Sequence, residues 1–164
     1  MQVPRRKFEK YTNLQVDPHV TQEKFDELSL KLSRMKKSRP ALAAEVHRLA
    51  ANGDFSENAE YQIAKGKLRG LNQRILDIED HLRKAVIIVP KVSDVVAIGS
   101  SVTISSDGKE KTFQILGSSE TKPEKGIISY QSPLGKALIN KRKGETASIS
   151  IGKRDVVYTI LHIT

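Results

Sequence analysis

Cysteine and tryptophan are absent from this sequence, and aromatic residues make up only 5% of it. Without cysteine there is no disulfide, no thiolate zinc site and no thiol nucleophile, which fits a reducing compartment. With 164 residues and so few aromatic side chains, one large core is not expected. No stretch approaches the roughly 18 apolar residues of a membrane span, and the first residues lack an apolar signal core. We therefore expect a soluble, cytoplasmic protein that does not contact a membrane.

Acidic residues are outnumbered, with 19 Asp and Glu against 28 Lys and Arg, and the formal net charge is +9. An excess of this size makes polyanions, and nucleic acid above all, the partners to consider. Solubility alone is the alternative explanation. The four histidines lie far apart in the sequence and form no metal-ligand pattern.

Two series of apolar residues, spaced alternately three and four positions apart, run through the first half of the chain. The first contains Phe25, Leu28, Leu32, Met35, Leu42, Val46 and Leu49, with Arg39 as an exception. The second contains Tyr61, Ala64, Leu68, Leu71, Ile75, Ile78, Leu82 and Ala85. This spacing is typical of the core positions of a coiled coil, so the sequence predicts two long helices.

The two predicted helices should fold back on each other, because a short polar stretch separates two apolar seams of equal length. In an antiparallel hairpin the numbers of facing residues have a constant sum. Leu49 with Tyr61 and Phe25 with Ala85 both give 110, which centres the turn on residue 55. We assign residues 20–88 to this hairpin, whose arms are rods roughly 35 to 45 Å long at about 1.5 Å per residue.

The turn of the hairpin carries two acids, Asp54 and Glu57. Their spacing of three is that of a capping box, in which side chains satisfy the free N–H groups at the start of a helix. The spacing fits a catalytic pair at the tip equally well. A capping role alone does not explain why these acids stand at the end of a rod with a basic middle.

The middle of the hairpin is strongly basic, since no acid occurs between Leu28 and Ala44 or between Tyr61 and Leu76. The constant sum places residues 36–45 opposite residues 65–74, so the two basic runs overlap in space. We expect this patch to contact RNA or phosphate through four side chains, Lys36, Lys37, Lys65 and Arg69. A solvated helix face is the alternative.

After Ala85 the heptads stop, and the pattern changes to short alternating segments separated by glycines. We expect a short strand at residues 86–90, a linker over 89–98, and five further strands near residues 101–105, 111–116, 126–130, 146–151 and 156–163. Ser132 as cap and Pro133 at the first helical position predict a short helix that ends near Ile139. Residues 99–164 should therefore form a small α+β domain.

Three segments resemble the bacterial GreA/GreB family of transcript cleavage factors. The stretch GDFSENAEYQIAKGKL, residues 53–68, resembles the family's tip motif, residues 20–28 resemble its helix opening, and residues 128–145 resemble its Ser-Pro turn and short helix. The resemblance covers residues 20–164 and implies an FKBP-like fold for the C-terminal domain. Residues 1–19 are left as a basic N-terminal extension, which we expect to be flexible.

The resemblance implies that Asp54 and Glu57, at a tip over residues 53–61, are catalytic acids and that Lys65 binds the RNA 3′ end. Position 50, which is basic in the family, is alanine here. The two acids would hold Mg²⁺ together with the active site of RNA polymerase, since two carboxylates cannot fill its six-ligand shell. The chain would then be a monomeric cofactor of the polymerase, with the nascent RNA as second partner, and not an enzyme.

The resemblance also implies that Ser132, Pro133 and Leu134 dock on the polymerase, although these residues could simply start and pack the short helix. An FKBP-like fold raises prolyl isomerase activity, but three aromatic residues are too few for the aromatic-lined pocket which that reaction needs. Two further functions stay open: a channel-plugging inhibitor of RNA polymerase, and a non-catalytic nucleic-acid-binding coiled coil. The sequence does not decide between the GreA and GreB subtypes.

Overall fold

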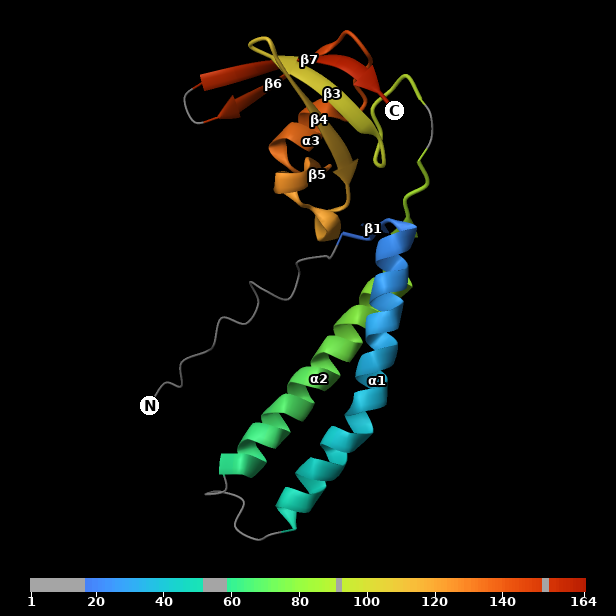
Figure 1. Cartoon of the computed structure of the whole chain (residues 1–164), viewed down its shortest axis with the longest axis vertical. Coiled ribbons are helices and arrows are strands. Elements are labelled where there is room, and N and C mark those ends of the chain that lie inside the picture. The colour runs from blue at the N-terminus through green and yellow to red at the C-terminus, as the bar shows by residue number, and fades with distance from the viewer. Residues whose placement is uncertain (1–16, 52–58, 91–92, 152–153) are drawn as a thin grey trace, which may run out of the picture.

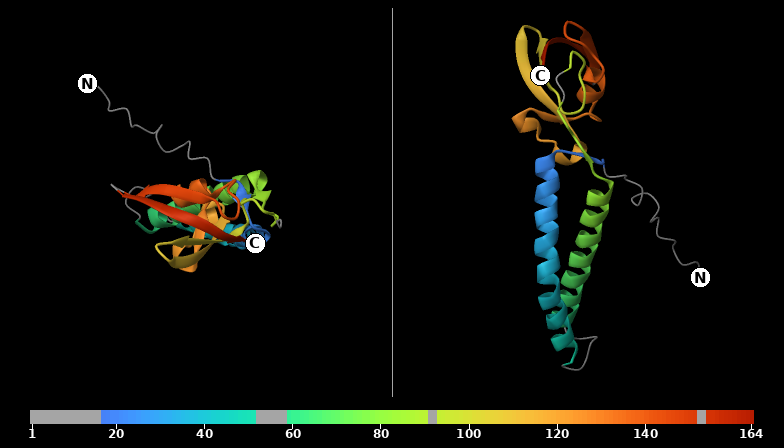
Figure 2. Two further views of the ribbon diagram at one scale, coloured as in Figure 1. Left: turned by 90° about the horizontal axis from the view of Figure 1, so that it is seen from above. Right: turned by 90° about the vertical axis from the view of Figure 1, so that its right-hand side faces the viewer.

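The computed structural model describes residues 17–51, 59–90, 93–151 and 154–164. Two long helices, α1 and α2, form an antiparallel hairpin, and a small β-sheet domain lies at the end where α1 begins and α2 finishes (Figure 1). The right panel of Figure 2, turned by 90° about the vertical axis, shows the two helices of the hairpin extending lengthwise from this domain. The predicted α+β class with an N-terminal helical hairpin is confirmed.

Helix α1 spans Gln22–Ala50 and α2 spans Ala59–Lys84. Thr21 caps α1, because its Oγ1 accepts a hydrogen bond from the Lys24 N–H at 3.2 Å. Pro40 lies inside α1, and the helix continues through it. Both helices carry basic residues in their last turn, where they complement the negative end of the helix dipole.

The apolar seam between the two helices lies at the positions predicted from the sequence. Every predicted seam position is buried or half-buried, with the single exception of Arg39, which is exposed. Leu28, Leu49, Ala64 and Ile75 are the buried seam residues, and they lie along the length of both helices. The predicted coiled-coil hairpin is therefore confirmed for the described parts of both arms.

The C-terminal domain is built on a five-stranded sheet with the order β5-β4-β3-β7-β6. Its strands are β3 (Ser101–Ser106), β4 (Lys109–Leu116), β5 (Ile127–Ser129), β6 (Thr146–Ile151) and β7 (Arg154–Ile163). Neighbouring strands are antiparallel except β4 and β5, which pair in parallel. Two short 3₁₀ helices, η1 (Ser118–Glu120) and η2 (Pro123–Lys125), lie in the connection between those two strands.

Helix α3 (Pro133–Leu138) supplies Leu138 to the core of this domain. The other buried core residues come from the strands and from the segment that leads into them: Val96, Val102, Ile104, Ile115, Ile128, Ala147 and Ile160. The predicted cap is confirmed, since Ser132 Oγ accepts from the Gly135 N–H at 3.0 Å and Pro133 is the first helical residue.

Two boundaries differ from those expected from the sequence. Val96 is completely buried in the domain core, so the second half of the expected linker, residues 89–98, belongs to the domain. At the other end of the hairpin, Asp17 is buried and His19–Val20 forms strand β1, which pairs in parallel with β2 (Val86–Ile87). The last residues of the expected 1–19 extension are thus part of the fold.

The seam makes Ile75 and Leu76 a matched pair for a stability test, because they are adjacent on α2 and differ in exposure, at 7% against 58%. We expect Ile75→Ala to reduce the free energy of unfolding by about 2 kcal/mol or more, through loss of buried contacts. Leu76→Ala should change it by about 0.5 kcal/mol or less. Urea unfolding followed by helical circular dichroism checks both values, and equal effects would contradict the seam.

Candidate nucleic-acid interface

The tip of the hairpin is the first part of the predicted interface. Asp54 and Glu57 lie outside the described residues, so their assignment stays a prediction. The arms are closed close to this point, since Leu49 on α1 is 5% exposed and Ala64 on α2 is 3% exposed. The described helices therefore run side by side to the last turns before the tip.

Lys65 lies in the second turn of α2, and its side chain is exposed. Its Nζ is 5.5 Å from the centre of the half-buried Tyr61 ring, which is a cation–π contact. Arg69 is one turn further along and is also exposed, so the two cations share one face of α2. This face presents two positive charges, with Lys65 on the tip side and Arg69 at mid-hairpin.

Lys36 is placed differently from Lys65, because its Nζ forms an ion pair with Glu79 on α2 at 2.6 Å. By the register of the seam, Lys65 lies opposite residue 45, which is roughly 13 Å along α1 from Lys36. Lys37 is exposed beside Lys36. The four predicted side chains therefore form a stripe along the rod and not one cluster, and the charge of Lys36 is partly neutralised.

A groove of about 780 Å³ lies between the two arms at mid-hairpin. Residues from both helices line it: Lys36, Arg39, Pro40, Ala43, Leu68, Asn72, Ile75, Leu76 and Glu79. The exposed Arg39 occupies a seam position here, and an arginine cannot close the seam as leucine does because its guanidinium must reach water. The groove is thus lined by apolar side chains of both helices together with two cations, Lys36 and Arg39, and one acid, Glu79.

The second part of the predicted interface is the start of α3. Ser132 is half-buried, and its hydroxyl donates to the Ser129 carbonyl at 2.6 Å while it caps the helix. Leu134 is half-buried against the domain core, whereas Pro133 is exposed. Of the three predicted docking residues, Pro133 is thus the exposed one. Ser132 also caps α3, and Leu134 also packs against the domain core.

The described residues contain no group of three or more His, Asp or Glu side chains close enough to hold a metal ion. Within the same parts of the chain, no helix is both long and apolar enough to cross a membrane.

Two protein-family models match this chain, and together they include nearly all of the helices and strands described above. Residues 19–87 match the model for the transcription elongation factor N-terminal domain, and residues 90–164 match the model for the GreA/GreB C-terminal domain. The chain belongs to the GreA/GreB family of transcription elongation factors.

Curated Gre relatives match over most of their length. Transcription elongation factor GreA of Nautilia profundicola is 39% identical over 147 residues, which cover 86% of this chain and 90% of that protein. GreA of Novosphingobium aromaticivorans is 35% identical over 144 residues, covering 86% and 91%. Among solved structures, GreA factor homolog 1 of Thermus thermophilus matches with a TM-score of 0.40 and 24% identity, covering 85% of this chain and 94% of that one.

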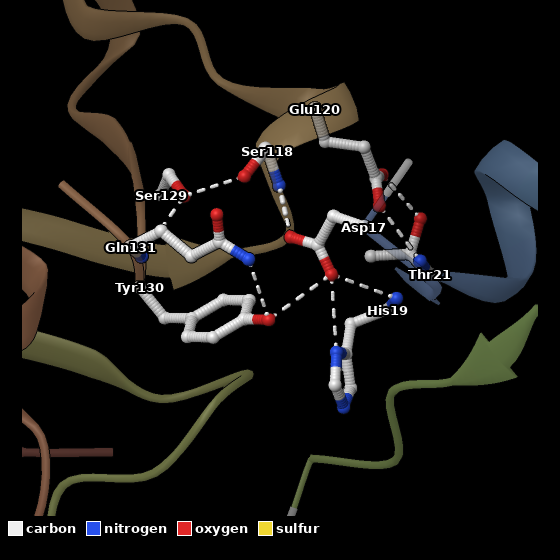
Figure 3. A network of polar contacts seen from close by, with 8 residues as sticks. All are labelled: Asp17, His19, Thr21, Ser118, Glu120, Ser129, Tyr130 and Gln131. Carbon is white, nitrogen blue, oxygen red and sulfur yellow. Dashed lines mark hydrogen bonds and ion pairs between the residues drawn. The ribbon is translucent and has the colours of Figure 1, made fainter. Parts of the chain in front are cut away.

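One buried acid of this Gre-family chain, Asp17, is not among the residues predicted from the sequence; it is 6% exposed and lies at the centre of the polar network in Figure 3. Burial by itself raises the pKa of Asp17, but hydrogen bonds from Ser118 and His19 outweigh that effect and hold the pKa below its ordinary value. No sequence pattern could have found this site, because Asp17 and Ser118 are separated by 101 positions.

The lowered pKa predicts how the stability of the Gre-family protein depends on pH. Ionised Asp17 stabilises the fold above the ordinary aspartate pKa of about 3.9, and the contribution is lost as the pH falls through the lower folded-state pKa. We expect Asp17→Asn to reduce the free energy of unfolding by about 1.5 kcal/mol at neutral pH. Urea unfolding at a series of pH values should show this deficit shrinking in acid, and a deficit independent of pH would contradict the ionised network.

Proposed function

We propose that this chain binds bacterial RNA polymerase, inserts its hairpin into the secondary channel and stimulates the polymerase's own cleavage of backtracked RNA. The shape of the hairpin is the observation behind this proposal, because its seam residues are buried or half-buried from Leu28 near the base to Leu49 and Ala64 near the tip, except at Arg39. A thin rod of this kind can enter a channel that excludes a globular domain. Family membership and the tip motif at residues 53–68 support the same function.

Asp54 and Glu57 would act at the reactive phosphate of the RNA. Carboxylate oxygens are ligands that suit Mg²⁺, but two of them leave most of its octahedral shell to other donors, which fits a site shared with the polymerase. When bound there, Mg²⁺ would stabilise the charge on the phosphate and lower the pKa of the attacking water. One carboxylate would orient that water and take its proton.

The products of this reaction follow from the bond that breaks. Water attacks the phosphorus of a phosphodiester, the bond to the upstream 3′ oxygen breaks, and that oxygen receives a proton. A short 3′ fragment leaves with a 5′ phosphate, and the shortened transcript ends in a new 3′-OH that the polymerase can extend. The catalytic site belongs to the polymerase, so the chain alone would be inactive.

The basic stripe and the start of α3 would hold the complex together. Lys65 and Arg69 are exposed and share one helix face, and Lys65 is the nearer of the two to the tip, which suits contact with phosphates of the RNA close to its 3′ end. Lys36 and Lys37 would extend the contact toward the base of the rod. Pro133 would meet the outer surface of the polymerase, with Ser132 and Leu134 shaping the turn that presents it.

Stalled, backtracked transcription complexes with Mg²⁺ provide the direct test of the two acids. We expect the wild-type chain to release short RNA fragments, and the double variant Asp54→Asn with Glu57→Gln to lower the rate about a hundredfold or more. The double variant should still compete with the wild type for the polymerase. Asp77→Asn, which removes an exposed acid far from the tip, is the matched control and should retain full activity.

Each other outcome of this assay supports a different function. Normal cleavage by the double variant would leave Asp54 and Glu57 as a capping pair. Inhibition of elongation without fragment release would support the channel-plugging alternative. Tight, salt-dependent binding to free RNA without any effect on the polymerase would support a general nucleic-acid-binding coiled coil.

The stripe of cations is tested by a pair of lysines on α2. Lys65 and Lys67 are both exposed, but about 200° of helix rotation separates their directions. We expect Lys65→Ala to lower the cleavage rate at limiting factor roughly fivefold, as for the loss of an exposed ion pair of about 1 kcal/mol. Lys67→Ala should change it less than twofold. Equal losses in titrations of both variants would point to net charge and not to a specific RNA contact.

A further inference from the structure

The junction between the hairpin and the sheet domain is bridged by the carboxylate of Asp17 (Figure 3). Asp17 Oδ2 accepts a hydrogen bond from the Ser118 N–H at 2.7 Å, and Oδ1 lies 3.3 Å from the Tyr130 hydroxyl, which donates to it. The same Oδ1 accepts from the His19 N–H at 3.1 Å and lies 3.1 Å from His19 Nδ1. One buried side chain thus joins the segment before α1 to η1 and to Tyr130, the residue that follows β5.

A second carboxylate ties the first turn of α1 to the same 3₁₀ helix. Glu120 Oε2 accepts from the Thr21 N–H at 2.7 Å, and Glu120 Oε1 accepts from the Thr21 hydroxyl at 2.6 Å. Thr21 is itself the N-cap of α1. The sheet domain therefore holds the residue at which α1 begins.

The two ends of the hairpin are also joined by backbone hydrogen bonds. The Val86 N–H donates to the Pro18 carbonyl at 2.7 Å, and the Ile88 N–H donates to the Val20 carbonyl at 2.8 Å. Val20 is completely buried in this contact. Because β1 and β2 are paired, a change of direction at the junction must move both arms together.

The segment before α1 and the sheet domain lie so close together that position 117 has no room for a side chain. A Cβ atom built on Gly117 would lie 1.9 Å from the His19 carbonyl oxygen, which is backbone and cannot rotate away. The His19 ring packs edge-on against Tyr130, with 5.3 Å between the ring centroids. Glycine is required here for space and not for its backbone angles, since its φ is −68°.

From these contacts we infer that Asp17 and Glu120 are positioning residues, which fix the direction of the hairpin relative to the docking domain and so set where the tip acids arrive. This inference rests on the proposed function. A rotation of roughly 10° at the base of a rod roughly 40 Å long moves its far end by roughly 7 Å. A misplacement of about 1 Å at a reacting centre can cost about a hundredfold in rate, so the direction of the rod matters.

The absence of cysteine permits a direct measurement of the direction. Spin labels on two introduced cysteines, Ala44→Cys on α1 and Lys109→Cys on β4, occupy exposed positions on the two modules. The distance distribution between them should be narrow in the labelled parent chain. It should broaden or shift when Asp17→Ala and Glu120→Ala are combined, and when Gly117→Ala is introduced alone.

Glu124→Ala is the matched control for the distance measurement, because it removes an exposed acid from the neighbouring η2. This variant should leave the distribution unchanged. Circular dichroism confirms that each variant keeps its helices, and Glu120→Ala alone replaces the double variant if that one does not fold. An unchanged distribution in folded variants that lack these carboxylates would overturn the inference.

Cleavage assays separate positioning from docking. The Asp17→Ala, Glu120→Ala variant should lower the maximal cleavage rate about tenfold or more, while its half-saturating concentration stays within about twofold of the wild type. A raised half-saturating concentration with an unchanged maximal rate would show a role in binding and overturn the positioning role. If the wild type stimulates no cleavage, the proposed function fails, whereas the label distances still decide whether these carboxylates fix the hairpin.

Discussion

The apolar seam between α1 and α2 is the constraint on which the molecule depends. The hairpin buries little else, since only Leu28, Leu49, Ala64 and Ile75 on these helices are buried and most other positions face water. A single seam makes a rod that is long and thin, and the rest of its surface is free to carry charge. The polar middle and the exposed cations are therefore a consequence of the same pattern that holds the arms together.

Much of the fold could be predicted from the sequence, because it is encoded locally. Heptad spacing repeats every two turns along one helix, and the Ser132-Pro133 start of α3 depends on two neighbouring residues. The junction could not be predicted in this way. Asp17 bonds to Ser118 and Thr21 bonds to Glu120, and no periodicity relates residues about a hundred positions apart. No local pattern indicates that residue 17 is buried, so the extension predicted from the sequence, residues 1–19, reaches too far into the fold.

In the candidate site, too, some features follow from the local sequence and others do not. The exposure of Lys37, Lys65 and Arg69 follows from their places outside the heptad core. The ion pair of Lys36 with Glu79 does not, because it depends on the register of side chains across the flank of the hairpin. Such an exposed pair stabilises the fold by at most about 1 kcal/mol, so it leaves Lys36 able to exchange Glu79 for a phosphate.

The proposed function requires the hairpin to carry Asp54 and Glu57 to the reactive phosphate of a backtracked RNA. A cryo-electron microscopy structure of the chain bound to a backtracked polymerase, prepared with the Asp54→Asn, Glu57→Gln variant to prevent cleavage, tests it most directly. We expect density for the hairpin inside the secondary channel, with positions 54 and 57 beside the RNA near its 3′ end. Density for the sheet domain alone, or a hairpin that points away from the channel, would contradict it.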